Sequence, residues 1–176
     1  MDVARAKISF NNVAMIGYLV KELNEKYPDA QVGKTVVQKM MFLLNRMKIC
    51  DFNYTLYHYG PFSSEVANEL DYASDLGIVE IEWEEDKGYF IRPLEKNGTY
   101  NIELSSDSKK AIDYLVSTYG RFNAAELSII ATGYYLMDNF GIQDCGLPQA
   151  VHEIKPKFGI EKIRNVLAEG LVTRKE

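Results

Sequence analysis

The chain of 176 residues is long enough for one domain with a sizeable core, and its 47% hydrophobic and 26% charged residues are typical of an ordinary globular protein. Two cysteines are too few for a disulfide framework or a cysteine-based zinc site, and we find neither a signal peptide nor an apolar run of the roughly 20 residues that a membrane span needs. We therefore expect a cytoplasmic protein that does not bind a membrane.

The net charge of −5 is distributed unevenly along the chain. Residues 61–105 carry 11 acidic and 3 basic residues, whereas residues 1–60 carry 5 acidic and 8 basic ones. The middle of the chain is therefore strongly acidic.

Two helices are predicted first. Apolar residues recur at helical spacing from Asn11, a candidate N-cap, to Tyr27, which precedes Pro28. A second apolar stripe begins at Thr35 and runs to Met47. On this second helix we expect a solvent-facing side made of Gln38, Lys39, Asn45, Arg46 and Lys48.

A short strand and a third helix follow. The segment YTLYHY, residues 54–59, alternates and predicts a strand that is broken by Gly60-Pro61. Ser63 is a suitable N-cap for a helix over 63–76, which Gly77 ends. Glu65 then lies in the first turn, where the helix dipole favours a negative charge.

A β-hairpin is predicted after this helix. Residues 79–84 alternate between apolar and acidic side chains, and after a turn at 85–88 the run YFIRPL forms a second strand, with Pro93 at its end or on an edge. The run TYNIEL, residues 99–104, alternates again. The order helix, helix, strand, helix, hairpin is typical of a winged helix-turn-helix.

The remainder predicts helices. One runs from Ser106 to Gly120, and Asn123 with Glu126 forms a capping-box start for the next. Pro148 starts a short helix that Pro156 stops, a last helix covers 159–167, and the tail 173–176 is expected to be loose. We predict an α+β fold: a winged helix-turn-helix core with a small antiparallel β-wing at 1–105, and a helical C-terminal subdomain at 106–176 packed on it.

No motif in the sequence predicts catalysis. Residues 32–35, VGKT, resemble the end of a phosphate-binding P-loop, but Pro28 stands where that motif needs a glycine. His58 as general base, Ser63 or Ser64 as nucleophile and Asp71 or Asp75 as orienter form a candidate triad, but the serines already have a sufficient role as helix caps. His152 has no metal-ligand spacing. We expect no enzyme activity, cofactor or metal.

A winged helix normally reads DNA with its third helix, but here that helix is acidic and has no basic residue. Nucleic-acid binding stays an alternative through the basic residues of the second helix, Lys34, Lys39, Arg46 and Lys48, or through a dimer that hides the acidic face.

Several segments resemble a known family. KTVVQKMMFL (34–43), YGPFSSEV (59–66), Leu70-Asp71 and LGIV (76–79) are similar to YwgA-like proteins over most of the chain, and more remotely, over 30–80, to the Panacea domain of SocA-type antitoxins. The resemblance implies a non-enzymatic module, because Panacea-type antitoxins neutralise toxins by direct contact and SocA-like members hand a toxin to a protease.

We therefore predict a non-catalytic regulatory or protein-binding module whose partner is another protein, with the toxin or protease-adaptor role implied by the resemblance alone. A DNA-binding transcriptional regulator and a hydrolase around His58 and Ser64 are the alternatives. The oligomeric state is open, a homodimer included. The predicted partner-binding residues are Lys34, Gln38, Lys39, His58, Tyr59, Gly60, Pro61, Phe62 and Glu65.

Overall fold

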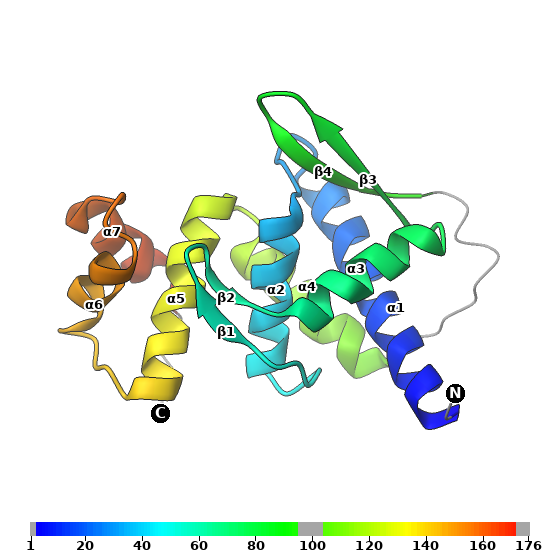
Figure 1. The fold of residues 1–176 in the computed structure, drawn as a ribbon, viewed down its shortest axis with the longest axis horizontal. Helices are drawn as coiled ribbons and strands as arrows, with labels where there is room; N and C mark the ends of the chain where they lie inside the picture. The colour runs from blue at the N-terminus through cyan, green and yellow to red at the C-terminus, as the bar shows by residue number, and fades with distance from the viewer. Residues whose placement is uncertain (1–2, 95–103, 172–176) are drawn as a thin grey trace.

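The computed structural model describes residues 3–94 and 104–171 as an α+β fold (Figure 1). Its helices are α1 (Val3–Lys26), α2 (Lys34–Arg46), α3 (Ser64–Asp75), α4 (Ser106–Tyr119), α5 (Ala124–Phe140), α6 (Leu147–Ile154) and α7 (Ile160–Gly170). Two separate antiparallel sheets pair β1 (Thr55–Tyr57) with β2 (Gly60–Phe62), and β3 (Val79–Glu84) with β4 (Gly88–Pro93). Among the described residues, no helix is both long and apolar enough to cross a membrane.

The first helix ends where the sequence predicts but begins earlier. α1 already includes Val3, so the predicted start at Asn11 is wrong. Asparagine inside a helix costs only a few tenths of a kcal/mol relative to good helix formers, on the order of 0.5. The neighbouring Phe10 contacts Tyr72 of α3, with ring centroids 6.4 Å apart. Tertiary packing thus outweighs a local capping signal.

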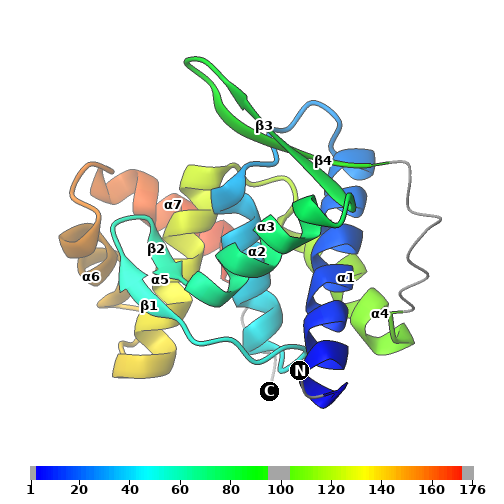
Figure 2. The ribbon, with the colours of Figure 1, turned by 45° about the vertical axis from the view of Figure 1, so that its right-hand side comes forward.

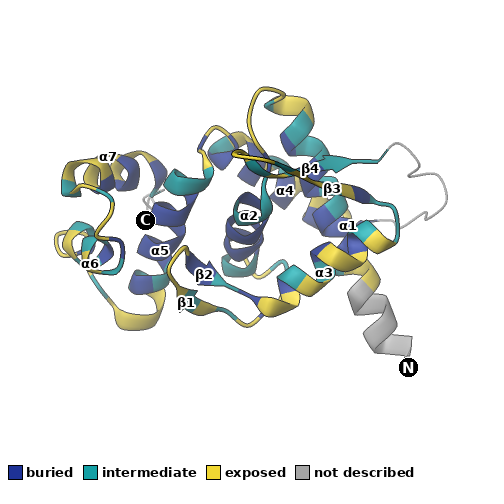
Figure 3. Cartoon of the chain, turned by 45° about the horizontal axis from the view of Figure 1, so that its top comes forward, coloured by how far each residue is buried: buried dark blue, intermediate teal, exposed yellow. Residues whose placement is uncertain are grey.

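The second helix lies in the centre of the molecule and is almost entirely buried (Figure 3). Its ends lie within one residue of the predicted ones, but the prediction that Gln38 and Lys39 face solvent is wrong. These side chains are 6% and 2% exposed. The reason is that α5 and β2 cover the side of α2 that the sequence assigns to solvent.

The segment around Gly60-Pro61 is a hairpin and not a strand followed by a break. Leu56 pairs with Pro61 and Tyr57 with Gly60, so the chain turns at His58 and Tyr59 and continues as β2. The proline is tolerated because each strand of a two-stranded sheet has a free edge. The predicted end of the sheet at Gly60 is therefore wrong, although the predicted strand before it is confirmed.

The third helix and the following hairpin match the prediction. Ser63 caps α3, because its hydroxyl accepts a hydrogen bond of 3.3 Å from the amide of Val66. β4 packs on α1 and β3 on α3, the turn end of this hairpin projects beyond the helices (Figures 1 and 2), and Pro93 ends β4. The predicted run at 99–104 falls almost entirely outside the described residues, and the tail 173–176 lies outside them.

The C-terminal helices begin and end close to the predicted residues. Asn123 and Glu126 form the expected capping box at the start of α5, and α6 has its proline in the first turn. α4 packs on α1 and α5 packs on α2. Buried hydrophobic residues from Val13 to Leu167 form one core cluster, so both predicted domains contribute to the same core. Their division at residue 105 stays a prediction.

Candidate binding site

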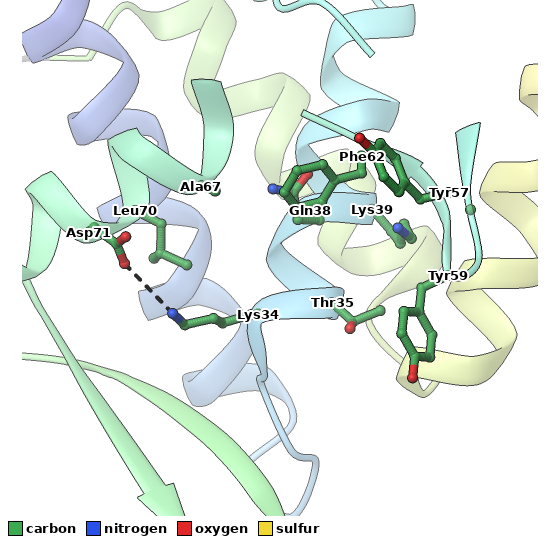
Figure 4. A pocket seen from close by; sticks show the side chains of 11 residues that line it. Lys34, Thr35, Gln38, Lys39, Tyr57, Tyr59, Phe62, Ala67, Leu70 and Asp71 are labelled. Atoms are coloured by element: carbon green, nitrogen blue, oxygen red, sulfur yellow. Dashed lines mark ion pairs between the residues drawn. The ribbon is translucent and has the colours of Figure 1, made fainter. Parts of the chain in front are cut away.

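A cavity of about 360 Å³ lies between α2, α3 and the β1–β2 hairpin (Figure 4). Its walls are mainly the apolar parts of side chains, with two lysines and one carboxylate among them. The residues that line it are Lys34, Thr35, Gln38, Lys39, Tyr57, Tyr59, Gly60, Phe62, Ala67, Leu70 and Asp71.

Two tyrosine rings stand at the edge of this cavity. The side chains of Tyr57 and Tyr59 are 59% and 63% exposed. Tyr57 packs edge-on against Phe62, with ring centroids 5.6 Å apart, and the ammonium of Lys157 lies 5.0 Å from the ring centroid of Tyr59. Large rings that remain exposed beside an apolar cavity are typical of an interaction surface.

Two buried lysines donate hydrogen bonds to backbone carbonyls of the β1–β2 hairpin. Lys39 of α2 donates a hydrogen bond of 2.7 Å to the carbonyl of Pro61. Lys155, which directly follows α6, donates to the carbonyl of His58 at 2.9 Å and to the hydroxyl of Ser128 at 2.7 Å. Each lysine is only 2% exposed. The turn of the hairpin is therefore fixed by side chains from α2, from α5 and from the segment after α6.

Burial lowers the basicity of both amines. The pKa of Lys39 falls to about 7, first because the ammonium is desolvated and second because Lys155 is also positive. The pKa of Lys155 falls to about 8, first through desolvation and then through the charge of Lys157. Within the described part of the chain, no ion pair involves either Lys39 or Lys155.

Further buried polar contacts join the hairpin to its surroundings. The side-chain amide of Gln38 donates to the carbonyl of Ser63 at 2.8 Å and accepts from its amide at 3.1 Å. The hydroxyl of Ser128 donates to the carbonyl of Tyr59 at 2.6 Å. Because buried backbone groups are costly to leave unpaired, these contacts define one position for the segment 58–63.

A second and wider hollow of about 1000 Å³ adjoins the first. It shares Lys34, Thr35 and Tyr59 with the smaller cavity and extends to Trp83 and Tyr89 on the β3–β4 hairpin. Trp83 is 65% exposed and stacks edge-on with Tyr89, with ring centroids 4.8 Å apart. Lys34 lies between the two hollows. Exposed aromatic rings therefore line both of these neighbouring hollows.

Lys34 has two partners at this position. Its ammonium lies 3.7 Å from a carboxylate oxygen of Asp71 and 4.5 Å from the ring centroid of Tyr89. The residue belongs to the first turn of α2, directly after Gly33, which is the N-cap. Gly33 and Lys34 therefore have structural roles in the VGKT segment that do not involve a nucleotide.

The structure brings most of the predicted partner-binding residues to the cavity. Lys34, Gln38, Lys39, Tyr59, Gly60 and Phe62 line it. Pro61 is buried behind it, and its carbonyl accepts from Lys39. His58 is exposed on the turn, whereas Glu65 points away and accepts a hydrogen bond of 2.8 Å from the amide of Asn53.

The basic side predicted for the second helix is smaller than expected. Lys39 is buried, and Arg46 binds Asp138 of α5, with 2.9 Å between a guanidinium nitrogen and a carboxylate oxygen. Lys34 and Lys48 remain partly or fully exposed. A continuous basic stripe along α2 is therefore not formed.

The structure does not place either serine of the hydrolase alternative as a nucleophile beside His58. Ser63 is 1% exposed, and its hydroxyl caps α3. Ser64 is exposed and is the first residue of that helix. Within the described residues, no hydrogen bond joins the His58 ring to either serine, and no group of three His, Cys, Asp or Glu residues is placed to hold a metal ion.

Sequence reasoning missed Lys155 and Ser128, which contact the hairpin from far along the chain. Nothing in the local sequence marks them, because Ser128 lies within the ordinary helical pattern of α5 and Lys155 directly follows that of α6. Lys39 did carry a signal: it lies three residues after Val36 and four before Leu43, both on the buried stripe of α2. That spacing indicates burial for any residue type.

Comparison with known proteins assigns no family to this chain. A scan against protein-family models finds none that matches the chain, and a search of curated proteins finds no relative. The resemblance to YwgA-like proteins and the Panacea domain therefore stays a prediction from the quoted motifs.

Proposed function

We propose that this protein is a non-catalytic binding module that docks a segment of another protein in the depression between α2, α3 and the two β-hairpins. The observation that carries the proposal is the pair of exposed rings, Tyr57 and Tyr59, beside an apolar cavity. Aromatic residues around a cavity that can accept an anchor side chain are typical of the central part of protein interfaces.

The rigid support of these rings favours binding. Lys39, Lys155 and Ser128 hold the carbonyls of the turn that carries the rings. A surface that is ordered before binding loses less conformational entropy when a partner docks. The hairpin is thus preorganised as a docking element.

Assigning residues 1–105 to a winged helix is compatible with this proposal. In it, α3 is the third helix of the core and the β3–β4 hairpin is the wing. The exposed residues of α3 include Glu65, Asp71 and Asp75, and the helix contains no lysine or arginine. Such a surface repels a phosphate backbone, so a protein partner is favoured over DNA. The toxin partner implied by the Panacea resemblance is one such protein.

Capture of partners from the native cell tests the proposal. We expect the tagged wild-type protein to retain a partner that the double variant Tyr57→Ala/Tyr59→Ala loses by at least about 10-fold, because truncating central interface rings costs about 2 kcal/mol or more. The variant Tyr114→Ala is the matched control, since Tyr114 is also exposed but lies on α4. Quantitative mass spectrometry of the retained proteins measures the difference.

Two results would contradict the docking proposal. One is equal retention of all partners by the wild type and the double variant. The other is retention of nucleic acid in place of protein, which would favour the transcriptional regulator.

A further inference from the structure

Two ammonium groups lie in the protein interior without a carboxylate beside them. Lys39 and Lys155 are each 2% exposed, and their hydrogen bonds in the described structure go to carbonyl and hydroxyl oxygens. Buried charges in proteins are normally paired with an opposite charge, because desolvation of an isolated ion is costly. Burial lowers the pKa of both amines to about 7 and 8, yet part of each population stays protonated at neutral pH, and the absence of an anion beside that charge needs an explanation.

The position of Lys39 gives one. Its side chain forms part of the wall of the 360 Å³ cavity, and Figure 4 shows the amine end between the side chains of Tyr57 and Tyr59. An ammonium has three donors, and Lys39 uses one of them on the Pro61 carbonyl. The hydroxyl of Thr35 lies one helical turn earlier on the same face of α2. An anion entering the cavity can therefore meet an incompletely paired ammonium.

The rest of the cavity selects for more than an anion. Phe62, Ala67 and Leu70 supply apolar walls, and the volume suits a single large side chain. Asp71 is the one carboxylate on the cavity wall, and it is already paired with Lys34. Glu65, Asp71 and Asp75 of α3 are exposed to solvent, and their charges are therefore screened at longer range. The ligand chemistry that fits is an apolar group attached directly to a carboxylate.

The wider hollow indicates what this ligand is attached to. The two hollows are neighbours, because Lys34, Thr35 and Tyr59 line both of them. A chain whose last residue occupies the small cavity can extend through the wide one towards Trp83 and Tyr89. The final residue of a polypeptide provides both required groups on one Cα atom, since it carries a side chain and the terminal carboxylate.

We propose that the cavity binds the C-terminal residue of a partner protein, with its apolar side chain against Phe62 and Leu70 and its carboxylate on the Lys39 ammonium. The inference rests on the proposed docking function and adds the chemical identity of the anchor. Lys39 is the specificity-determining residue of this site, and Lys155 keeps the hairpin in position for it.

A matched pair of peptides tests the inference on the full-length protein. The probes are acetyl-Ala-Ala-Phe with a free carboxylate and the same peptide as its C-terminal amide, titrated against ¹⁵N-labelled protein by NMR. We expect the acid to bind about 10-fold more tightly than the amide, because a charge-assisted hydrogen bond to a buried ammonium is lost in the amide. The shifts should fall on residues that line the small cavity.

Two variants test whether the preference for the acid over the amide depends on the Lys39 amine. Lys39→Met should bind acid and amide with equal affinity. Lys34→Met is the control, because Lys34 also lines the cavity but is exposed and paired with Asp71, and it should keep most of the preference for the acid. The comparison of acid with amide on the wild type needs no variant and holds even if Lys39→Met does not fold.

Three results would overturn the inference. Equal affinity of the wild type for acid and amide is one, and absence of binding by either peptide is another. Equally tight binding of 3-phenylpropanoate, a free apolar acid, would make a small molecule the occupant. Each of these can occur while Tyr57→Ala/Tyr59→Ala still loses a captured partner, so failure of the anchor and failure of the docking proposal are distinguishable.

Discussion

At the scale of single residues, Lys39 has the most consequences for stability and for binding. It occupies a buried position on α2, and its amine supports the carbonyl of Pro61. The sequence shows a lysine at a helix position next to the apolar stripe, but it does not show which elements cover that lysine. The covering elements, α5 and the β1–β2 hairpin, come from other parts of the chain. The polarity of a residue indicates exposure on average only, and an amine with carbonyl partners can be buried.

The buried amine predicts how stability depends on pH. The pKa of Lys39 in the folded protein, about 7, lies below its ordinary value of 10.5. Between these pH values the unfolded chain binds more protons than the folded one, so the free energy of unfolding rises with pH from about 7 towards 10. Lys155, with a pKa of about 8, acts in the same direction from about pH 8.

Urea denaturation of the wild type and of Lys39→Met at pH 6 and pH 9.5 checks this prediction. The wild type should gain on the order of 3 kcal/mol more than the variant between the two pH values. The difference between the proteins cancels groups common to both, including Cys50, whose pKa is raised by burial. The same pH dependence in both proteins would show that Lys39 is not desolvated in the folded state.

At the scale of secondary-structure elements, local signals predicted most helices and failed at the first hairpin. Ser63, Asn123 and Pro148 begin helices as expected, because capping and proline effects act within one turn. Gly60-Pro61 was expected to end a sheet, yet it continues as β2. A strand this short is stabilised by α5 behind it, which no local pattern can indicate.

Removal of the cap on α3 is a test at this scale. Ser63→Ala should lower the free energy of unfolding by about 1 kcal/mol, because the Val66 amide loses its acceptor inside the protein. Ser64→Ala is the matched control, since Ser64 is exposed and is already within the helix. Chemical denaturation measures both, and equal losses would contradict the capping role.

At the scale of the whole molecule, the C-terminal helices shape the candidate site. α5 contributes Ser128 and Thr132 beneath the hairpin, and the chain after α6 contributes Lys155. Gly60 has a φ of +90°, and a Cβ added there would lie 2.7 Å from the hydroxyl oxygen of Thr132. The docking surface therefore depends on residues from both predicted domains.

A comparison of two glycines tests this close approach. Gly60→Ala should cost about 3 kcal/mol, from both the left-handed backbone and the contact with α5. Gly77→Ala should cost about 1 kcal/mol, because Gly77 has a φ of +70° but no atom of the described residues lies within 4 Å of an added Cβ. Thermal and urea unfolding of both variants measures the difference, and equal costs would show that the hairpin yields without loss.

The sequence by itself determined the position and ends of nearly every described helix, the β3–β4 hairpin and the acidic character of α3, since these depend on neighbours within a few residues. Only the tertiary structure decided which elements cover Gln38 and Lys39, that Lys155 reaches the carbonyl of His58, and that the two hollows share lining residues. These features depend on which elements pack together, and contacts between residues 39, 61, 128 and 155 leave no periodicity in the chain.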